Sequence, residues 1–263
     1  MCFAFEAHPP ELPAGLVLPS LAGGASAERL ELTSPDGTRF AAALAATPRD
    51  AGAGVLILPD VRGLYGFYAE LAERFAQAGH HAIAIDYFGR TAGPPPRDES
   101  FDHMPHVLQT RLEQIQGDAA AAVATLRERT GTGPVVSVGF CFGGTQSFMA
   151  ATSAELDLAG AVGFYGTLVA RRPGAPTVLD HTAEIRCPIL GLFGGADEAI
   201  PPDQVETFDR GLSEAGIDHE IVTYPGTPHS FFDRAFAEHA EACDDAWRCV
   251  VGFVDRVGAG ARG

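Results

Sequence analysis

The segment VVSVGFCFGG, residues 135–144, joins a short apolar run to a turn that is rich in glycine. The apolar residues at 135–138 predict a strand that is buried on both faces, and a helix is predicted from about 143. A strand that turns directly into a helix crowds the residue at the turn, and glycine at positions 139 and 143 relieves this crowding. The pattern G-x-nucleophile-x-G is that of a nucleophile elbow, with Cys141 where serine is commoner. These residues therefore predict an α/β fold with a nucleophilic thiol at the end of a central strand.

Strands and helices alternate along most of the rest of the chain. The patterns predict further strands at 55–58, 82–85, 161–165, 189–193 and 219–223, and a hairpin over about 29–40 that turns at Asp36-Gly37. The predicted helices are 68–78, 105–129, one from about 143, 203–215 and 236–257. Residues 89–98 contain the run Pro94-Pro95-Pro96 and are predicted to form an irregular loop. This alternation predicts a mainly parallel central sheet with helices on both faces, a three-layer fold whose site lies in the loops at the carboxyl ends of the strands.

The composition is that of a single globular domain. The 263 residues are 46% hydrophobic and 20% charged, and no linker or repeat divides them, so we expect one domain over 1–263. Within it, 1–27 is predicted to be an irregular N-terminal arm and 258–263 a flexible tail. With 18 cationic and 34 acidic residues, the net charge of -16 argues against nucleic acid and membrane surfaces as partners.

The cysteines and the absence of apolar spans predict a cytoplasmic location. The five cysteines are an odd number without CxxC spacing, which is typical of thiols in a reducing compartment rather than of a disulfide framework. The first residues lack a basic and an apolar region, and no apolar stretch reaches the roughly 18 residues of a membrane span. We therefore expect a soluble cytoplasmic protein.

Cys141 has the local environment that a nucleophile needs. The turn places its sulfur at a helix N-terminus, where the helix dipole favours the thiolate. The N–H of Phe142, at the start of that helix, is then available to bind an oxyanion. The alternative interpretation is a small buried cysteine in a glycine turn, because free cysteine is often buried.

Two further loops supply partners for this nucleophile. Asp197 follows the predicted strand at 189–193, and His229 lies in the loop after the strand at 219–223. A lone aspartate after a strand is usually a turn or helix cap, but the chain order Cys141, Asp197, His229 is the nucleophile–acid–histidine order of α/β-hydrolases. We therefore predict that these three residues form a catalytic triad.

The sequence resembles the dienelactone hydrolase family (carboxymethylenebutenolidases) over about residues 28–257. The resemblance is carried by GFCFGG (139–144), GAD (195–197) and PHSF (228–231), with support from PDVRG (59–63), DYFGR (86–90) and GFYG (163–166). It implies an α/β-hydrolase fold, a Cys–His–Asp triad, and hydrolysis of an ester or lactone through a thioester acyl-enzyme without a cofactor.

The resemblance also implies roles for residues around the triad. The backbone N–H groups of Val61 and Phe142 would form the oxyanion hole. A glutamate of the family, which hydrogen-bonds the resting thiol and helps to ionise it, corresponds to Asp60, whose side chain is one methylene shorter. We therefore predict Asp60 as a thiol-modulating residue, with an ordinary loop-capping carboxylate as the alternative.

Arginines of the carboxyl-end loops are candidates for binding a substrate. Dienelactone hydrolase itself holds its substrate's carboxylate with two arginines, one of them four residues after the catalytic histidine; that position here is Asp233, followed by Arg234. Arg97 is the nearest candidate for the other arginine. Without the arginine after the histidine, dienelactone itself is not the expected substrate. The predicted substrate-binding residues are Arg62, Arg90, Tyr165 and Ser230.

No metal, nucleotide or other cofactor is predicted. The pairs His103/His106 and His239/Cys243 lack the four convergent ligands of a structural zinc, and the chain has neither a GxGxxG motif nor a P-loop lysine. The predicted partner is a small-molecule ester or lactone, and the protein itself is expected to be a monomer or homodimer. The alternatives are a non-catalytic ligand-binding module on the same fold, and a cysteine-dependent acyl transfer or thioesterase activity.

Overall fold

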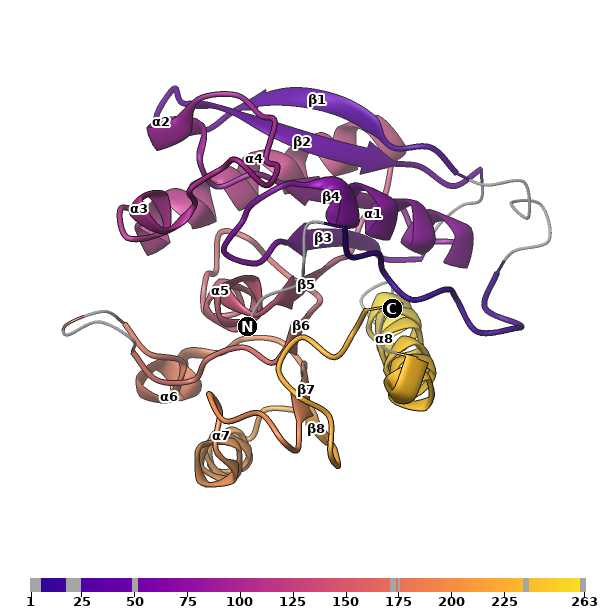
Figure 1. Ribbon diagram of the computed structural model, residues 1–263, viewed down its shortest axis with the longest axis vertical. Helices are drawn as coiled ribbons and strands as arrows, with labels where there is room; N and C mark the ends of the chain where they lie inside the picture. The colour runs from indigo at the N-terminus through magenta and orange to yellow at the C-terminus, as the bar shows by residue number, and fades with distance from the viewer. Residues whose placement is uncertain are drawn as a thin grey trace.

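The described residues form an eight-stranded sheet with helices on both faces (Figure 1). The computed structural model of the chain describes residues 6–17, 25–48, 52–170, 174, 176–233 and 237–260. The strand order is β1-β2-β4-β3-β5-β6-β7-β8, in which β1–β2 and β2–β4 are antiparallel and the other pairs are parallel. The prediction of a mainly parallel sheet in a three-layer α/β fold is therefore confirmed.

The strands coincide closely with the predicted ones, including the N-terminal hairpin. They are β1 (Glu28–Thr33), β2 (Arg39–Ala45), β3 (Gly54–Leu58), β4 (Ala82–Ile85), β5 (Val135–Phe140), β6 (Gly160–Phe164), β7 (Ile189–Gly194) and β8 (His219–Tyr224). The helices are α1 (Gly66–Ala78), α2 (Gly89–Ala92), α3 (Met104–Val107), α4 (Leu112–Thr130), α5 (Phe142–Ala150), α6 (Val178–His181), α7 (Pro202–Glu214) and α8 (Ala240–Gly260), with 3-10 turns η2 (Thr182–Glu184) and η3 (Ala237–His239). Within the described ranges, no helix is both long and apolar enough to cross a membrane.

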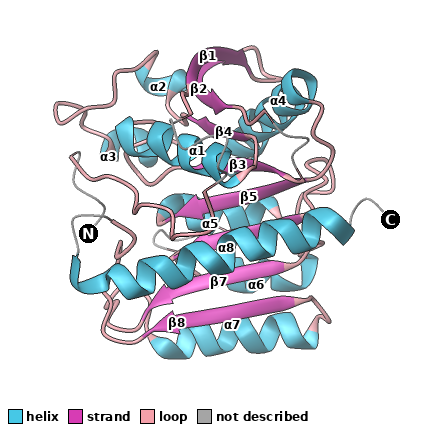
Figure 2. Cartoon of the chain, turned by 90° about the vertical axis from the view of Figure 1, so that its right-hand side faces the viewer, coloured by secondary structure: helices cyan, strands magenta, loops and turns pink. Residues whose placement is uncertain are grey.

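The apolar strands are buried from both sides because each face of the sheet carries its own helices. Figure 2 shows α1 and α8 in front of the sheet, with α5 and α7 behind it. In β3, Val55 and Ile57 belong to the cluster that includes α1 and α8, whereas Leu56 and Leu58 pack with α4 on the other face. Successive side chains of a strand point to opposite faces, so a strand covered on both faces needs an unbroken apolar run.

Three predicted segments differ from the structure. The helix predicted over 105–129 is divided, because Arg111 is extended (φ -124°) and separates the short helix α3 from α4. The loop predicted at 89–98 begins with the helical turn α2, and its prolines follow only after Gly93. The tail predicted from 258 is wrong for its first residues, because α8 continues through Gly260.

The N-terminal segment 6–17 contains no helix or strand but is packed against the helices. Ala7 and Leu12 are buried in the same cluster as α1 and α8, and the Trp247 indole N–H donates to the Pro10 carbonyl oxygen at 3.1 Å. The irregular arm over the whole of 1–27 and the assignment of the whole chain to one domain remain predictions, since 1–5 and 18–24 lie outside the described residues.

Candidate active site

Four candidate residues follow four neighbouring parallel strands. Cys141 follows β5, Tyr165 follows β6, Asp197 follows β7 and His229 follows β8. Because β5, β6, β7 and β8 pair in this order and run parallel, their carboxyl ends lie at one edge of the sheet. The structure therefore places the predicted triad residues in adjoining loops.

Cys141 occupies a sharp turn between β5 and α5. Its backbone is in the left-handed region, with φ 54° and ψ -112°, and Phe142 is the first residue of α5. A side chain at position 139 would collide with the Gly143 carbonyl, and one at position 143 would collide with the Leu58 carbonyl. The glycines are thus required by the close approach of strand and helix, as the sequence pattern predicted.

His229 and Asp197 form a short, buried hydrogen bond. The distance between His229 Nδ1 and Asp197 Oδ2 is 2.6 Å, and the side chains are 8% and 1% exposed. Burial opposes ionisation of Asp197, but the hydrogen bond and charge of His229 and the N–H of Ala199 at 2.9 Å outweigh it and lower the pKa of the carboxyl. A carboxylate on Nδ1 fixes the orientation of the imidazole and leaves Nε2 for proton transfer.

Tyr165 lies next to His229 in the structure. Its ring centroid lies 5.0 Å from that of His229, and its backbone has a left-handed φ of 38°. Burial raises the pKa of Tyr165 well above its ordinary value, and the negative charges of Cys141 and Asp60 raise it further. The structure therefore places the ring of Tyr165 beside that of His229, and the Cys141 N–H donates to the carbonyl of Phe164, the residue before Tyr165, at 3.0 Å. A role for Tyr165 in binding substrate stays a prediction, as does one for Ser230, which is buried beside the histidine.

The two predicted oxyanion donors lie on adjoining segments. Phe142 occupies the first position of α5, so its N–H has no acceptor within the helix. Val61 belongs to the loop after β3, the neighbour of β5 in the sheet. The α5 backbone touches this loop, since a side chain at Gly143 would meet the Pro59 carbonyl oxygen. The Tyr87 hydroxyl donates to that same oxygen at 2.9 Å, and its ring lies 5.4 Å from the ring of Phe142.

Asp60 and Arg62 form a buried ion pair on either side of Val61. Arg62 donates to Asp60 from Nη2 to Oδ2 (2.6 Å), from Nε to Oδ1 (3.2 Å) and from its backbone N–H to Oδ1 (2.8 Å). The side chains are 4% and 0% exposed. The thiol-modulating role of Asp60 stays a prediction. Both of its carboxylate oxygens are bound to Arg62 in the structure.

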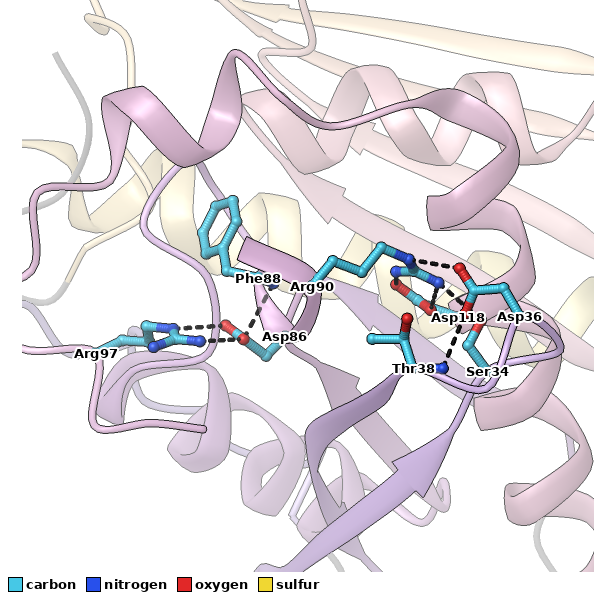
Figure 3. A network of polar contacts seen from close by, with 8 residues as sticks. All are labelled: Ser34, Asp36, Thr38, Asp86, Phe88, Arg90, Arg97 and Asp118. Carbon is cyan, nitrogen blue, oxygen red and sulfur yellow. Dashed lines mark hydrogen bonds and ion pairs between the residues drawn. The ribbon is translucent and has the colours of Figure 1, made fainter. Parts of the chain in front are cut away.

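The other arginines of these loops also bind carboxylates of the protein (Figure 3). Arg90 donates to both oxygens of Asp118 at 2.6 and 2.9 Å, to Asp36 at 2.8 Å and to the hydroxyl of Ser34 at 2.9 Å. This network joins α2, α4 and the β1–β2 hairpin, and within the described residues none of these contacts reaches the triad. The sequence pattern did not identify Asp118, which lies within a helix and is fully buried.

Arg97 and Asp233, the two positions compared with the arginines of the family, are both buried. Arg97 donates to Asp86 from Nη2 (2.8 Å) and Nε (3.2 Å). Asp233 lies in the loop after His229 and accepts the backbone N–H of His8 at 3.4 Å. Arg234 lies outside the described residues. No cluster of metal-ligating side chains occurs in the part of the chain that the structure describes.

A groove of about 840 Å³ opens beside the loop after β3. Its lining includes Leu64, Tyr65, the prolines at 94–96 and Arg97. Tyr65 connects this groove to the buried pair, because its hydroxyl accepts a hydrogen bond from Arg62 Nη2 at 2.8 Å.

Comparisons with known proteins show the family to which the chain belongs. A model of the dienelactone hydrolase family matches residues 41–258. The chain is 28% identical over 215 residues to the "Putative carboxymethylenebutenolidase" of Escherichia coli (strain K12), with 78% of this chain and 77% of the relative covered. It is 30% identical over 217 residues to "Protein usf" of Aquifex pyrophilus, with 79% and 90% covered. The solved structure of the "Putative Dienelactone Hydrolase from Klebsiella pneumoniae subsp. pneumoniae MGH 78578" matches with a TM-score of 0.74 at 24% identity, over 87% of this chain and 98% of that one, which supports the fold.

Proposed function

Because the chain belongs to the dienelactone hydrolase family and is a hydrolase, we propose that it cleaves a neutral ester or lactone with Cys141 as the nucleophile. The observation that carries this proposal is the arrangement at one edge of the sheet. A cysteine stands at a left-handed turn before a helix, and a histidine in a nearby loop has its Nδ1 2.6 Å from a buried aspartate. Such a nucleophile, base and orienting acid perform acyl transfer.

In the first half of the reaction, His229 takes the thiol proton at Nε2 and the Cys141 sulfur attacks the carbonyl carbon. A C–S bond forms, and negative charge develops on the carbonyl oxygen within reach of the proposed donors, the N–H groups of Val61 and Phe142. When the C–O bond breaks, the leaving alkoxide takes the proton back from His229 Nε2. The product is a thioester of Cys141 and a free alcohol, or an open hydroxyacyl chain if the substrate is a lactone.

In the second half, water replaces the alcohol. His229 Nε2 removes a proton from a water molecule, whose oxygen attacks the thioester carbonyl and forms a new C–O bond. The C–S bond then breaks, and the acid leaves while the thiolate regains the proton from His229. Asp197 stays ionised throughout and stabilises the imidazolium, consistent with its lowered pKa.

The preference for a neutral substrate rests on the charges around the site. Arg62, Arg90 and Arg97 are each bonded to a carboxylate of the protein. Asp233 occupies the position four residues after His229, where the family's namesake enzyme carries an arginine. A net charge of -16 adds a field that repels an anion. The three arginines that the sequence offered for binding a substrate's carboxylate are therefore each neutralised already by a carboxylate of the protein.

The test uses two esters of equal acyl length, p-nitrophenyl butyrate and p-nitrophenyl hydrogen succinate, together with neutral lactones. We expect kcat/KM for the butyrate to exceed that for the succinate by about 10-fold, since the two differ in one carboxylate. Acid-quenched samples of the wild type should carry a butyryl group on Cys141 by mass spectrometry, and the Cys141→Ala variant should carry none and hydrolyse neither ester.

The outcomes separate the candidate functions. Full esterase activity in the Cys141→Ala variant would overturn the proposal. A wild-type protein that binds esters without forming an acyl adduct would be a ligand-binding module. Faster turnover of an acyl thioester than of the matched oxygen ester would instead assign thioesterase activity, and preference for the succinate would overturn the neutral substrate.

A further inference from the structure

We propose that the Asp60–Arg62 ion pair positions the backbone N–H of Val61 as an oxyanion donor, so that Arg62 is a positioning residue of this hydrolase. The inference rests on the proposed function and assigns the pair a role that is neither binding a substrate anion nor ionising the thiol. Its basis is the hydrogen bonding of the loop after β3, where the two charged residues stand immediately before and after Val61.

The backbone N–H groups of this loop are almost all engaged. The N–H of Asp60 donates to the Tyr68 hydroxyl at 2.9 Å, that of Arg62 to Asp60 Oδ1 at 2.8 Å, and that of Gly63 to the Asp60 carbonyl at 3.1 Å. Further on, Leu64 donates to Asp86 Oδ1 at 3.1 Å. Among the described residues, only the N–H of Val61 in the stretch 60–64 has no acceptor in the protein.

The ion pair is what closes the loop around Val61. One oxygen of Asp60 accepts both the backbone N–H and Nε of Arg62, and the other accepts Nη2 at 2.6 Å. The guanidinium is itself held, because Nη2 donates to the Tyr65 hydroxyl at 2.8 Å and its carbon lies 4.5 Å from the Tyr65 ring centroid. A planar guanidinium in such a fork has little freedom to turn toward a ligand.

The opposite side of the turn is packed as tightly. Gly63 has φ 75°, and a side chain there would collide with Asp86 Oδ1. Asp86 is held in turn by Arg97, whose Nη2 lies 2.8 Å from Oδ2. Val61 is therefore fixed between two buried ion pairs, one on each side of the turn. Stabilising an oxyanion requires a donor that is already in place when the charge develops, and this arrangement provides one.

The test compares two reactions of Cys141 that differ in their need for an oxyanion hole. Acylation by p-nitrophenyl butyrate, followed as a single-turnover burst, develops an oxyanion, whereas alkylation by iodoacetamide does not. The variants are Arg62→Met, Asp60→Asn and the variant with both substitutions. The double variant removes both charges of the pair and so leaves neither of them buried without its partner. Arg62→Lys keeps the positive charge but lacks the paired donors of the guanidinium. It takes the place of the other variants in the test if they do not fold. The matched control is Arg74→Met, which removes a partly buried arginine paired with Glu70 on α1.

We expect Arg62→Met and the double variant to lower the acylation rate constant about 100-fold, as for a displaced catalytic group. Asp60→Asn should lower it less, because the amide oxygen can still accept the Arg62 N–H, and Arg62→Lys should restore part of the rate. The pH dependence of alkylation should stay that of the wild type in every variant, and Arg74→Met should change neither reaction.

Three results would overturn the proposal. Unchanged acylation in folded variants would make the pair purely structural. A shift in the pH profile of alkylation would mean that the pair acts on the thiol, and a change confined to KM for p-nitrophenyl hydrogen succinate would mean that Arg62 binds the substrate's carboxylate. A wild type that is alkylated but never acylated would instead overturn the proposed function, and the role of Val61 with it.

Discussion

The loops after β5, β6 and β8 and the loops after β3 and β4 lie at the same edge of the sheet but differ in how their residues are held. In the first group, Cys141, Tyr165 and Ser230 have left-handed φ values of 54°, 38° and 60°. Backbone of this kind costs on the order of 1–3 kcal/mol per residue in a non-glycine position and persists where the surrounding structure fixes it. The strain coincides with the cysteine, with a ring beside the histidine, and with the residue next to that histidine.

In the second group of loops the charged side chains are buried and neutralised in pairs. Asp60 binds Arg62 and Asp86 binds Arg97, with the carboxylates fully buried in both cases. Removing one partner of a buried pair is costly, whereas the intact pair holds two segments together. The difference fits the two proposals above: the strained loops carry the proposed reacting groups, and the paired loops would hold the backbone in place around them.

The largest effect on ester hydrolysis is expected from Asp197, the acid of the proposed triad. Asp197→Asn keeps the size of the side chain but removes the charge, so the amide can hold His229 in the wrong tautomer, and kcat for ester hydrolysis should fall about 10⁴-fold. Steady-state kinetics with p-nitrophenyl butyrate measures this loss. Glu198→Gln, at the exposed neighbouring position, should keep the wild-type rate. A loss of less than 10-fold in the Asn variant, after folding is verified, would remove Asp197 from the triad.

The next largest effect is expected on the alkylation rates of the thiols outside the strained loops. Burial raises the pKa of Cys187 and of Cys243 to about 12 and, together with the charge of Asp245, that of Cys249 to about 11. A thiol of pKa about 12 has on the order of a thousandfold less thiolate at pH 8 than one with the ordinary value of 9.0. Iodoacetamide at pH 8 should therefore label Cys141 before Cys187, Cys243 and Cys249.

Peptide mapping of labelled native and urea-unfolded protein measures this selectivity. Cys187 and Cys243 should react about a thousandfold more slowly in the native protein than in urea, by the same thiolate fractions. Labelling of Cys243 before Cys141 in the native protein would contradict the assignment of Cys141 as the nucleophile.

The sequence predicted most of the sheet because a strand covered on both faces must be apolar throughout. The run at 55–58 and the run at 82–85 are of this kind, and both are strands in the structure. The division between α3 and α4 was missed, because it depends on the extended backbone of Arg111 rather than on a break in the apolar pattern. Local patterns describe burial well and backbone exceptions poorly.

For the site, residue order and loop position identified Asp197 and His229, which the structure joins at 2.6 Å. What could not be predicted is which carboxylate each arginine binds. Asp118 lies 28 residues from Arg90 in the sequence, and no local pattern links a buried helical aspartate to a loop arginine. Pairing of this kind depends on tertiary packing, so a loop arginine appears available in the sequence when it is already occupied in the fold.

A smaller effect tests the network around Arg90. Asp118→Asn should destabilise the protein by about 3 kcal/mol, because it removes the buried charge that faces a guanidinium with 13% exposure. Urea unfolding measures this change, and kcat/KM for p-nitrophenyl butyrate should stay that of the wild type. Asp36→Asn changes the exposed carboxylate on the same guanidinium and should destabilise much less. If Asp118→Asn lowered kcat/KM in the folded protein, Arg90 would belong with the reacting groups after all.

The smallest effect is expected on the pH dependence of the unfolding free energy. It concerns the opposite edge of the sheet, where two buried histidines precede β4. Burial lowers the pKa of His80, and burial together with the charge of His80 lowers that of His81. His80 Nδ1 lies 3.2 Å from the Ala53 carbonyl and Nε2 lies 3.5 Å from Asp255, while His81 Nδ1 accepts the Thr47 N–H at 3.2 Å. These contacts hold His81 in its neutral form.

Because the folded-state pKa of both rings is depressed, the unfolded chain takes up protons first as the pH falls below the ordinary histidine pKa of 6.5. The stability that the neutral rings contribute is therefore fully present above pH 6.5 and is lost as the pH falls toward their folded-state values. Between pH 7 and pH 5, His80→Gln should reduce the loss of unfolding free energy by about 1 kcal/mol relative to the wild type, measured by urea unfolding at each pH. Equal losses in the two proteins would show that burial of His80 does not govern the acid sensitivity, because its ring would then take up a proton equally readily in the folded and the unfolded protein.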